Sequence, residues 1–293
     1  MFSKKDFAPV SLLIILALIW GTSFILIKKG LVVFSAGEVA ALRVATASIF
    51  LLPIALAHLR GLAFHDFAKL MASGLMGIFV PAFLFSFAQM HIDSSIAGIM
   101  NSLTPIWTMV IGAVLYGQRF TGFAILGTLV GFGGTLLLVM ARSTGISGGI
   151  NGYALLVVAA TLLYGSNLNF IKYKIEHIRS ITITSISVLM IAPFALVYLL
   201  FFTEFVPKLA AQEGALRAFS YVALLGLMST AFAVVLFNRL VKTHSPLFAS
   251  SVTYLIPVVA VMWGVLDGEQ LYTGHYIGML LIIGGVYLAN RKV

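Results

Sequence analysis

The side chains of this sequence that could do chemistry are hydrogen-bonding groups set inside long apolar stretches. Trp20 and Ser23 form an i, i+3 pair, as do Tyr164 and Asn167, so each pair lies on one helical face. A buried indole, hydroxyl or amide needs a hydrogen-bonding partner, and a bound small molecule is one such partner. We therefore predict that these four residues contact a polar ligand inside the protein.

A second set of polar side chains forms a stripe in another apolar stretch. Ser94, Ala97, Asn101, Thr104 and Thr108 are spaced by 3, 4, 3 and 4 residues, which places them on one helical face. Such a face of small, hydrogen-bonding residues either lines a cavity or packs closely against another helix. The same two interpretations apply to the polar residues before Pro257. The candidates for ligand contact in these two stretches are Asn101, Thr104, Ser250 and Tyr254.

Two further features could bear on a ligand, one aromatic and one charged. Phe79 and Phe83 share a helical face with Ser86, so we expect them at a cavity. Arg43 lies about two turns inside an apolar stretch, where an unpaired guanidinium is costly. Glu38, five positions earlier, is about 140° around the helix and poorly placed to pair with it. Arg43 should therefore bond another helix or bind a carboxylate-bearing substrate.

The elements that position these residues are membrane spans. The chain has 293 residues, of which 61% are hydrophobic and 9% charged, too few charges to cover a water-facing surface. Apolar runs such as 10–27 and 122–141 are long enough to cross a hydrocarbon core of roughly 30 Å. We therefore expect an all-α integral membrane protein whose solvent is the lipid bilayer.

Breaks with charged or turn-forming residues divide the chain into ten spans joined by short loops. The loops leave no room for a soluble domain. The predicted spans are 9–29, 36–57, 67–90, 94–116, 121–140, 151–172, 180–203, 215–239, 245–267 and 272–290.

The basic residues set the expected orientation. The net charge of +9 lies in the short breaks, so it indicates topology rather than a nucleic-acid partner. With a cytoplasmic N-terminus, alternate loops place most Lys and Arg residues inside. We expect a multi-pass protein of the bacterial cytoplasmic membrane with both termini cytoplasmic, and an uncleaved first helix rather than a secretory signal.

The two halves of the sequence are related by duplication. Gly74-Leu75-Met76 matches Gly226-Leu227-Met228 at an offset of 152, and the same offset brings Pro105 onto Pro257. Each half has five spans, and an odd number inserts the second copy upside down, with a pseudo-two-fold axis in the membrane plane. Secondary transporters with inverted repeats bind their substrates near the midplane between the halves. The equivalence of Pro105 and Pro257, each removing a backbone donor within a span, predicts a gating role.

Several motifs recur in both halves. At a shorter offset, Trp20-Gly21-Thr22-Ser23 faces Tyr164-Gly165-Ser166-Asn167. Each proline is followed by a Gly-Gln or Gly-Glu turn, at Gly117-Gln118 and Gly268-Glu269, and by a Gly-Gly pair in the last helix. This arrangement resembles the paired EamA-type repeats of the drug/metabolite transporter superfamily, with repeats at 9–140 and 151–290.

The resemblance implies a ten-helix permease made of two inverted five-helix repeats. It also implies amino acids or related metabolites as substrates, with export as the usual direction. The sequence departs from the family pattern in two places. Gln118 stands where the first repeat often has a glutamate, and Arg43 has no basic counterpart in the seventh span.

The groups that the spans lack narrow the expected substrate. No carboxylate lies near the middle of a span, which disfavours a multidrug-cation exchanger that needs a buried glutamate. No basic cluster beyond Arg43 suits a polyanion such as a nucleotide sugar. Neutral polar and aromatic walls fit a small neutral or zwitterionic metabolite, moved by alternating access through a central cavity.

The sequence also bears on two other functional classes. A channel or facilitator for small solutes is the alternative to a carrier. An enzyme is not expected, because the sequence has no HExxH motif, paired acidic motif or Ser/His/Asp arrangement. With no cysteine and only scattered histidines, we expect no catalytic residues, metal site or cofactor.

GxxxG spacings in the fifth and tenth spans permit close approach of helices. They run from Gly127 to Gly131 and from Gly274 to Gly278. They predict either packing within the chain or a homodimer formed through these two spans.

Overall fold

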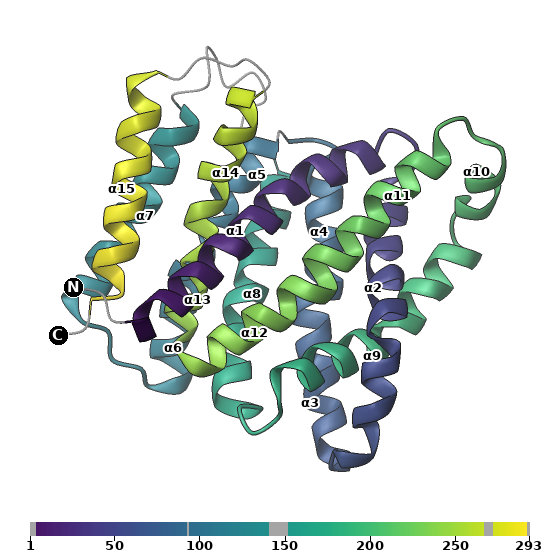
Figure 1. The fold of residues 1–293 in the computed structure, drawn as a ribbon, viewed down its shortest axis with the longest axis horizontal. Coiled ribbons are helices and arrows are strands. Elements are labelled where there is room, and N and C mark those ends of the chain that lie inside the picture. The colour runs from purple at the N-terminus through teal and green to yellow at the C-terminus, as the bar shows by residue number, and fades with distance from the viewer. Residues whose placement is uncertain (1–3, 93, 141–151, 267–271, 292–293) are drawn as a thin grey trace.

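A computed structural model describes residues 4–92, 94–140, 152–266 and 272–291, and in this part the chain is helical, without a strand (Figure 1). The turn residues Asp267, Gly268 and Glu269, and the connection at 141–151, lie outside the described residues. The first-half helices are α1 (Lys4–Gly30), α2 (Ala36–His58), η1 (Leu59–Gly61), α3 (Phe64–Gly74), η2 (Leu75–Phe79), α4 (Val80–Ala88), α5 (Ser94–Asn101), α6 (Thr104–Tyr116) and α7 (Gly122–Met140). The second-half helices are α8 (Ala154–Lys174), α9 (Ser180–Phe201), α10 (Phe205–Ala211), α11 (Ala215–Leu225), η3 (Gly226–Phe232), α12 (Ala233–Thr243), α13 (Pro246–Ser250), α14 (Val252–Leu266) and α15 (Thr273–Ala289).

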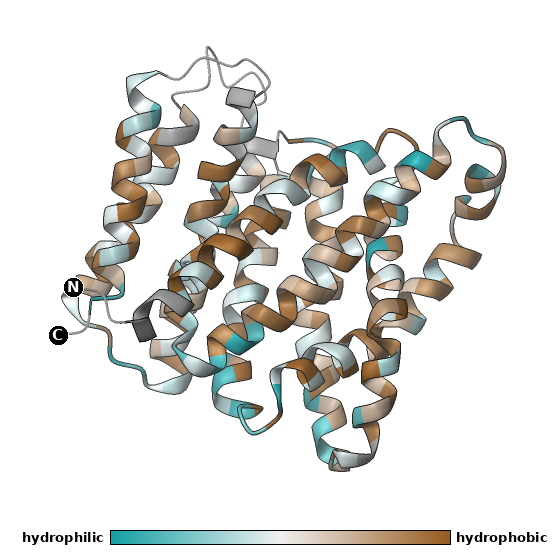
Figure 2. Cartoon of the chain, in the orientation of Figure 1, coloured by the Kyte–Doolittle hydropathy of each residue, from teal (hydrophilic) through white to brown (hydrophobic). Residues whose placement is uncertain are grey.

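The predicted spans correspond to these helices. Among the described residues, 6 continuous helical segments are long and apolar enough to cross a membrane. Shorter apolar helices at Thr104–Tyr116, Gly122–Leu137, Pro246–Val259 and Thr273–Ala289 supply the other four spans. Figure 2 shows hydrophobic residues along the lengths of the helices and hydrophilic residues gathered at their ends and connections. The fold class predicted from the sequence is confirmed.

Glycine contacts reveal how the two repeats interlock. A Cβ added at Gly21 would lie 2.7 Å from the Cβ of Val259, and one added at Gly165 would lie 2.9 Å from the Cβ of Trp107. Gly165 follows Gly21 by 144 residues, and Val259 follows Trp107 by 152. The first span of each half therefore packs against the fourth span of the other half at equivalent positions.

The second span of each half packs in the same reciprocal way against the third span of the other half. A Cβ at Gly74 would lie 2.8 Å from the backbone oxygen of Ser187, and one at Gly226 would lie 2.7 Å from that of Arg43. Gly226 follows Gly74 by 152 residues, and Ser187 follows Arg43 by 144. These reciprocal contacts are those of two inverted repeats whose helices interleave around a pseudo-two-fold axis.

Irregular segments also recur in both halves. The third and eighth spans contain the π-helical turns η2 and η3, which start at Leu75 and Gly226. The fourth span is interrupted between α5 and α6, and the ninth between α13 and α14. Loosened or broken turns of this kind are tolerated within a membrane where the backbone faces protein or a cavity.

The structure corrects the expected position of one of the two prolines, Pro105. Pro105 lies in the first turn of α6, where its missing N–H costs no helical hydrogen bond, rather than in the middle of a bent helix. Pro257 lies inside α14, past the interruption. In each case a hydroxyl bonds the carbonyl four residues before the proline. Thr104 Oγ1 donates to Asn101 O at 2.8 Å, and Ser102 Oγ donates to Thr253 O at 3.3 Å.

The glycines of α7 and α15 pack within the chain. A Cβ at Gly134 would lie 2.9 Å from the backbone oxygen of Gly278, and one at Gly285 would lie 2.7 Å from that of Gly127. The two helices therefore touch through their backbones. Gly127 and Gly278, one from each GxxxG spacing, thus take part in packing within the chain. The homodimer stays a prediction.

Candidate substrate cavity

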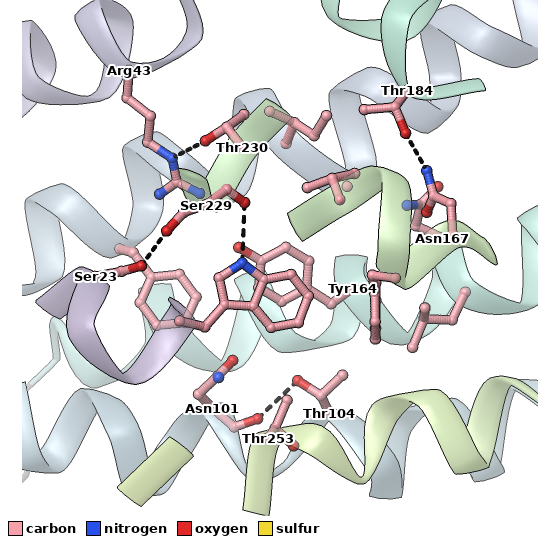
Figure 3. Close-up of a pocket in the computed structure, with 18 of the residues that line it drawn as sticks. Ser23, Arg43, Asn101, Thr104, Tyr164, Asn167, Thr184, Ser229, Thr230 and Thr253 are labelled. Carbon is pink, nitrogen blue, oxygen red and sulfur yellow. Dashed lines mark hydrogen bonds between the residues drawn. The ribbon is translucent and has the colours of Figure 1, made fainter. Parts of the chain in front are cut away.

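A cavity of about 130 Å³ lies between the two halves and is lined by helices of both (Figure 3). A single buried water needs a cavity volume of roughly 10–15 Å³. The cavity can therefore hold on the order of ten water-sized groups. That is the size of a small metabolite such as an amino acid.

The cavity lies on the pseudo-two-fold axis, because its wall residues occur as pairs of equivalent positions. The members of a pair are 144 residues apart in the first two spans of each half and 152 apart in the third and fourth. The pairs are Trp20 and Tyr164, Ser23 and Asn167, Phe24 and Leu168, Arg43 and Ser187, Gly77 and Ser229, Ile78 and Thr230, Phe85 and Phe237, Asn101 and Thr253, and Thr104 and Ile256.

Trp20 and Ser23 lie at the wall as the sequence predicts, and α1 fixes them against η3. The indole N–H of Trp20 donates to the backbone oxygen of Ser229 at 3.1 Å, and the hydroxyls of Ser23 and Ser229 are hydrogen-bonded. The Trp20 ring packs edge-on against Phe237, with centroids 4.9 Å apart. This part of the wall is preorganised by contacts between the halves.

Tyr164 and Asn167 form the equivalent part of the wall on α8. The Tyr164 ring stacks on Phe85 at a centroid distance of 6.0 Å. Asn167 Oδ1 accepts a hydrogen bond from Ser73 Oγ at 2.8 Å, which joins α8 to α3. The first helix of each half thus presents an aromatic ring and a polar side chain to the cavity.

Arg43 bonds another helix, which is one of the two alternatives that the sequence leaves open. Its Nε donates to Thr230 Oγ1 at 2.8 Å, and Figure 3 shows the guanidinium beside the Ser229 and Thr230 side chains. Glu38, five positions before Arg43 in the sequence, pairs instead with Lys208 Nζ at 2.8 Å. The guanidinium therefore reaches the cavity without a carboxylate partner from the described part of the protein.

The polar stripe of the fourth span reaches the cavity through Asn101 and Thr104, which are 7% and 2% exposed. The Asn101 side-chain oxygen is buried without a hydrogen-bond partner, as is the side-chain nitrogen of Gln89, another wall residue. Buried polar atoms are normally hydrogen-bonded, so orphaned ones in a cavity are natural contacts for a ligand.

The two phenylalanines expected at the cavity lie elsewhere. Phe79 and Phe83 pack on each other with centroids 5.0 Å apart, and Phe83 contacts Tyr198 at 5.3 Å. Phe79 also meets Phe194, so both rings fill the space toward α9. The π-helical turn η2 shifts the helical register here, and Ile78 faces the cavity instead.

Ser250 and Tyr254 also lie outside the cavity wall. Ser250 Oγ donates to the backbone of its own helix at Leu247 O, 2.9 Å away. The Tyr254 hydroxyl donates to Thr128 O at 2.9 Å, so this ring joins α14 to α7. The neighbouring Thr253 lines the cavity instead, because adjacent helical residues point about 100° apart.

Several wall residues were missed by the motif analysis, among them Ser187, Ser229, Thr230 and Phe237. The sequence did contain a signal for them. Each is the repeat equivalent of another wall residue, so pairing the candidate Arg43 through the duplication leads to Ser187. Others, such as Asn238 and Thr184, which bond each other at 2.9 Å, have no wall residue as repeat equivalent.

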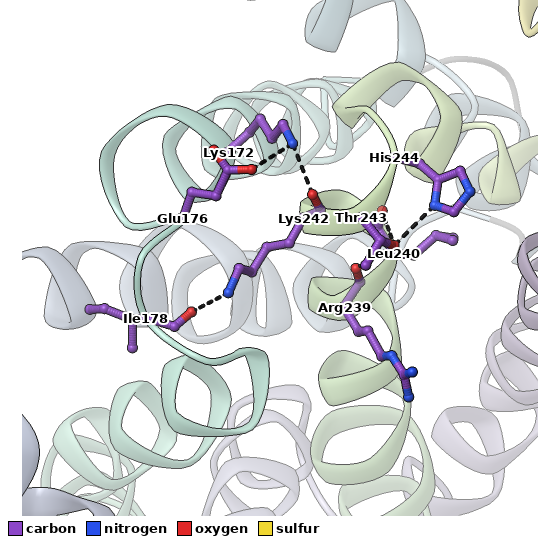
Figure 4. Close-up of polar contacts among 8 residues, drawn as sticks. All are labelled: Lys172, Glu176, Ile178, Arg239, Leu240, Lys242, Thr243 and His244. Atoms are coloured by element: carbon purple, nitrogen blue, oxygen red, sulfur yellow. Dashed lines mark hydrogen bonds and ion pairs between the residues drawn. The ribbon is translucent and has the colours of Figure 1, made fainter.

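Polar contacts hold the spans together beyond the cavity. At the junction of α8 and α12, Lys172 Nζ bonds Glu176 at 2.7 Å and Lys242 O at 2.8 Å, and the Lys242 side chain bonds Ile178 O (Figure 4). On the same side, Asp66 of α3 lies 3.3 Å from the ring nitrogen of His177. The contact between Asp66 and His177 links the two halves at one end of the bundle.

Comparisons with known proteins match nearly the whole chain. The model of the EamA-like transporter family matches residues 8–140 and 151–291. An "Uncharacterized transporter" of Archaeoglobus fulgidus is 26% identical, over 93% of this chain and 95% of that protein. The "Uncharacterized inner membrane transporter YedA" of Escherichia coli K12 is 26% identical, over 94% and 88%.

A third relative and a solved structure also match this chain over nearly its whole length. The "Probable terminal-alkyne amino-acid exporter" of Streptantibioticus cattleyicolor is 25% identical, over 96% of this chain and 92% of that protein. A solved structure titled "Crystal structure of protein" has a TM-score of 0.74 and 20% identity, over 97% and 96% of the two chains, and so has the same fold. With its helical inverted repeats and a family match in each half, this chain belongs to the EamA-like transporter family.

Proposed function

We propose that this membrane transporter moves a small neutral or zwitterionic metabolite, of the amino-acid class, by alternating access through the central cavity. The observation that carries the proposal is the cavity on the pseudo-two-fold axis, walled by equivalent residues of both halves. When inverted repeats rock against each other, a site on their axis can open to either side of the membrane. Asn101 and Gln89 offer it unpaired polar atoms.

The substrate class follows from the wall chemistry. Aromatic rings and neutral hydroxyl and amide groups surround the space, and Arg43 supplies a cation. Such walls fit a compact molecule with one polar end and one apolar part. The similarity to a protein named as an amino-acid exporter supports amino acids and the export direction.

Counterflow in proteoliposomes tests the carrier proposal against the channel alternative. Vesicles with purified protein, loaded with one unlabelled amino acid, purine or simple amine, should transiently accumulate the same compound in labelled form. Accumulation should saturate with concentration. Flux that stays linear with concentration, without accumulation, would favour a channel or facilitator.

Loss of single wall side chains should slow this transport. We expect Asn101→Ala and Tyr164→Ala each to lower counterflow about tenfold, the value of one or two contacts in a desolvated site. Tyr276→Ala is the control, since Tyr276 is 55% exposed on α15. Membrane expression should stay normal in all three, and unchanged uptake kinetics in both wall variants would contradict the assignment of this cavity.

We also propose that the protein lies in a bacterial cytoplasmic membrane with both termini cytoplasmic. In Figure 1, α1 begins and α15 ends on the side where α8 meets α9, opposite α10. The chain has no cysteine, so introduced cysteines can be labelled singly. In intact cells, an impermeant maleimide should label Glu213→Cys between α10 and α11. His177→Cys, after α8, should react only in opened cells, and the reverse pattern would invert the topology.

The remaining parts of the proposal concern partners. We infer no cofactor, nucleic-acid partner or enzymatic activity. A homodimer through the fifth and tenth spans would have to use the lipid-facing sides of α7 and α15, because Gly127 and Gly285 pack against each other within the chain.

A further inference from the structure

We propose that the cavity recognises a monocarboxylate zwitterion, with its carboxylate bound by Arg43 and its amino group by Asn101. This inference rests on the proposed function, since it assigns chemistry to the same cavity. It goes beyond that proposal by excluding uncharged solutes and simple amines as preferred substrates.

The Arg43 guanidinium is only partly hydrogen-bonded by the described residues. Its only hydrogen bond with the described residues is from Nε to Thr230 Oγ1, which leaves the two terminal NH2 groups as donors. A guanidinium in a site shielded from water is costly without an anion, and its planar fork matches a carboxylate. The Thr230 hydroxyl lies beside it in Figure 3 and can donate to the same carboxylate.

The charge of the cavity is asymmetric, although its wall residues occur as equivalent pairs from the two halves. The repeat equivalent of Arg43 is Ser187, a neutral wall residue whose hydroxyl donates to Leu70 O at 2.7 Å. Among the cavity-lining residues that the structure describes, Arg43 is the one cation, and no aspartate or glutamate accompanies it. One cation on one side of the axis neutralises one carboxylate and gives the substrate a single orientation.

The side-chain oxygen of Asn101 has no hydrogen-bond partner among the described residues. It is an acceptor without a donor in a side chain that is 7% exposed. A protonated amino group has donors and no acceptor, so it complements this atom. In Figure 3, Asn101 and Arg43 approach the cavity from opposite sides of the view, with aromatic rings between them.

The apolar remainder of the substrate would contact rings. Trp20, Phe24, Phe85 and Phe237 line the cavity along with aliphatic side chains. A volume of about 130 Å³ suits an amino acid of about the size of leucine. Leucine is therefore a probe whose functional groups can be removed one at a time at nearly constant shape.

Binding to purified wild-type protein tests the carboxylate requirement. The probes are leucine, leucinamide without the carboxylate charge, 4-methylpentanoate without the amino group, and 3-methylbutylamine without the carboxylate. Isothermal titration should show leucine binding most tightly and leucinamide at least about tenfold more weakly, because a charged hydrogen-bonded pair is lost. The amine should bind no better than leucinamide.

Variants of Arg43 test whether the preference for leucine over leucinamide depends on this side chain. Arg43→Gln should weaken leucine binding about ten- to a hundredfold and leave leucinamide binding nearly unchanged, so the preference between them disappears. Arg43→Lys should retain part of the preference because it keeps the charge. Arg239→Gln is the matched control, since Arg239 is exposed on α12 and lies outside the cavity wall.

Two outcomes would overturn the inference. One is equal binding of leucine and leucinamide, or no binding of leucine, to the wild-type protein. The other is an Arg43→Gln variant that keeps its preference for leucine while its thermal unfolding matches that of the wild type. If either outcome occurs and an uncharged solute still shows counterflow, the carrier proposal stands and only the carboxylate site is wrong. If no compound shows counterflow, the carrier proposal itself is wrong.

Discussion

Gly285→Leu should strongly destabilise the protein. A Cβ at this position would lie 2.7 Å from the backbone oxygen of Gly127, and a backbone atom cannot move aside as the end of a side chain can. Overpacking a tight contact costs about 1–3 kcal/mol, and we expect the upper end or more because α7 and α15 must separate. At roughly 2–4 °C per kcal/mol, the midpoint of thermal unfolding in detergent should fall by about 10 °C.

The neighbouring glycine supplies the control. A Cβ at Gly284 would meet no heavy atom within 4 Å, so Gly284→Leu adds the same side chain to the same helix without a contact to break. Its unfolding midpoint should stay within a few degrees of the wild-type value. Equal stability of the two variants would show that the backbone contact between α7 and α15 is not tight.

Lys208→Met should produce the second large loss of stability. Its ammonium pairs at 2.8 Å with Glu38, whose side chain is 1% exposed, so the substitution leaves a buried carboxylate without its cation. Removing one partner of a buried pair costs about 3–5 kcal/mol, and water reaching the 26% exposed lysine site should reduce this to about 2 kcal/mol. Chemical or thermal unfolding in detergent would measure the loss.

A double variant separates the lost charge from lost packing. Glu38→Gln together with Lys208→Met removes both charges, and the amide can still accept the hydrogen bond that Ser35 N now donates at 2.6 Å. The double variant should recover most of the stability that Lys208→Met loses. Lys29→Met, at an exposed position, should have little effect. A double variant as unstable as the single one would mean that the lysine stem, not its charge, matters.

Much of the cavity wall could be predicted from the sequence, because the duplication identifies equivalent positions in the two halves. Trp20, Ser23, Tyr164 and Asn167 were predicted from a repeated motif, and all four line the cavity. Their roles in binding remain predictions that the proposed variants test.

The errors arose where the helices depart from regular geometry. The polar residues before Pro257 predict Tyr254 at the cavity, whereas the cavity faces the neighbouring Thr253. The interruption before α14 resets the direction of the following residues, and a one-residue difference turns a side chain by about 100°. The π-helical turn η2 similarly turned Phe79 away and Ile78 inward.

The sequence by itself determined the membrane setting, the number of spans and the inverted duplication. These depend on composition, on apolar length and on residue spacing, which the chain carries locally. Only the tertiary structure decided which glycine of each Gly-Gly pair forms a backbone contact, with Gly285 packed and Gly284 open. It also decided that Arg43 bonds Thr230 and that Glu38 pairs with Lys208, because such partners are brought together by packing between helices far apart in the chain.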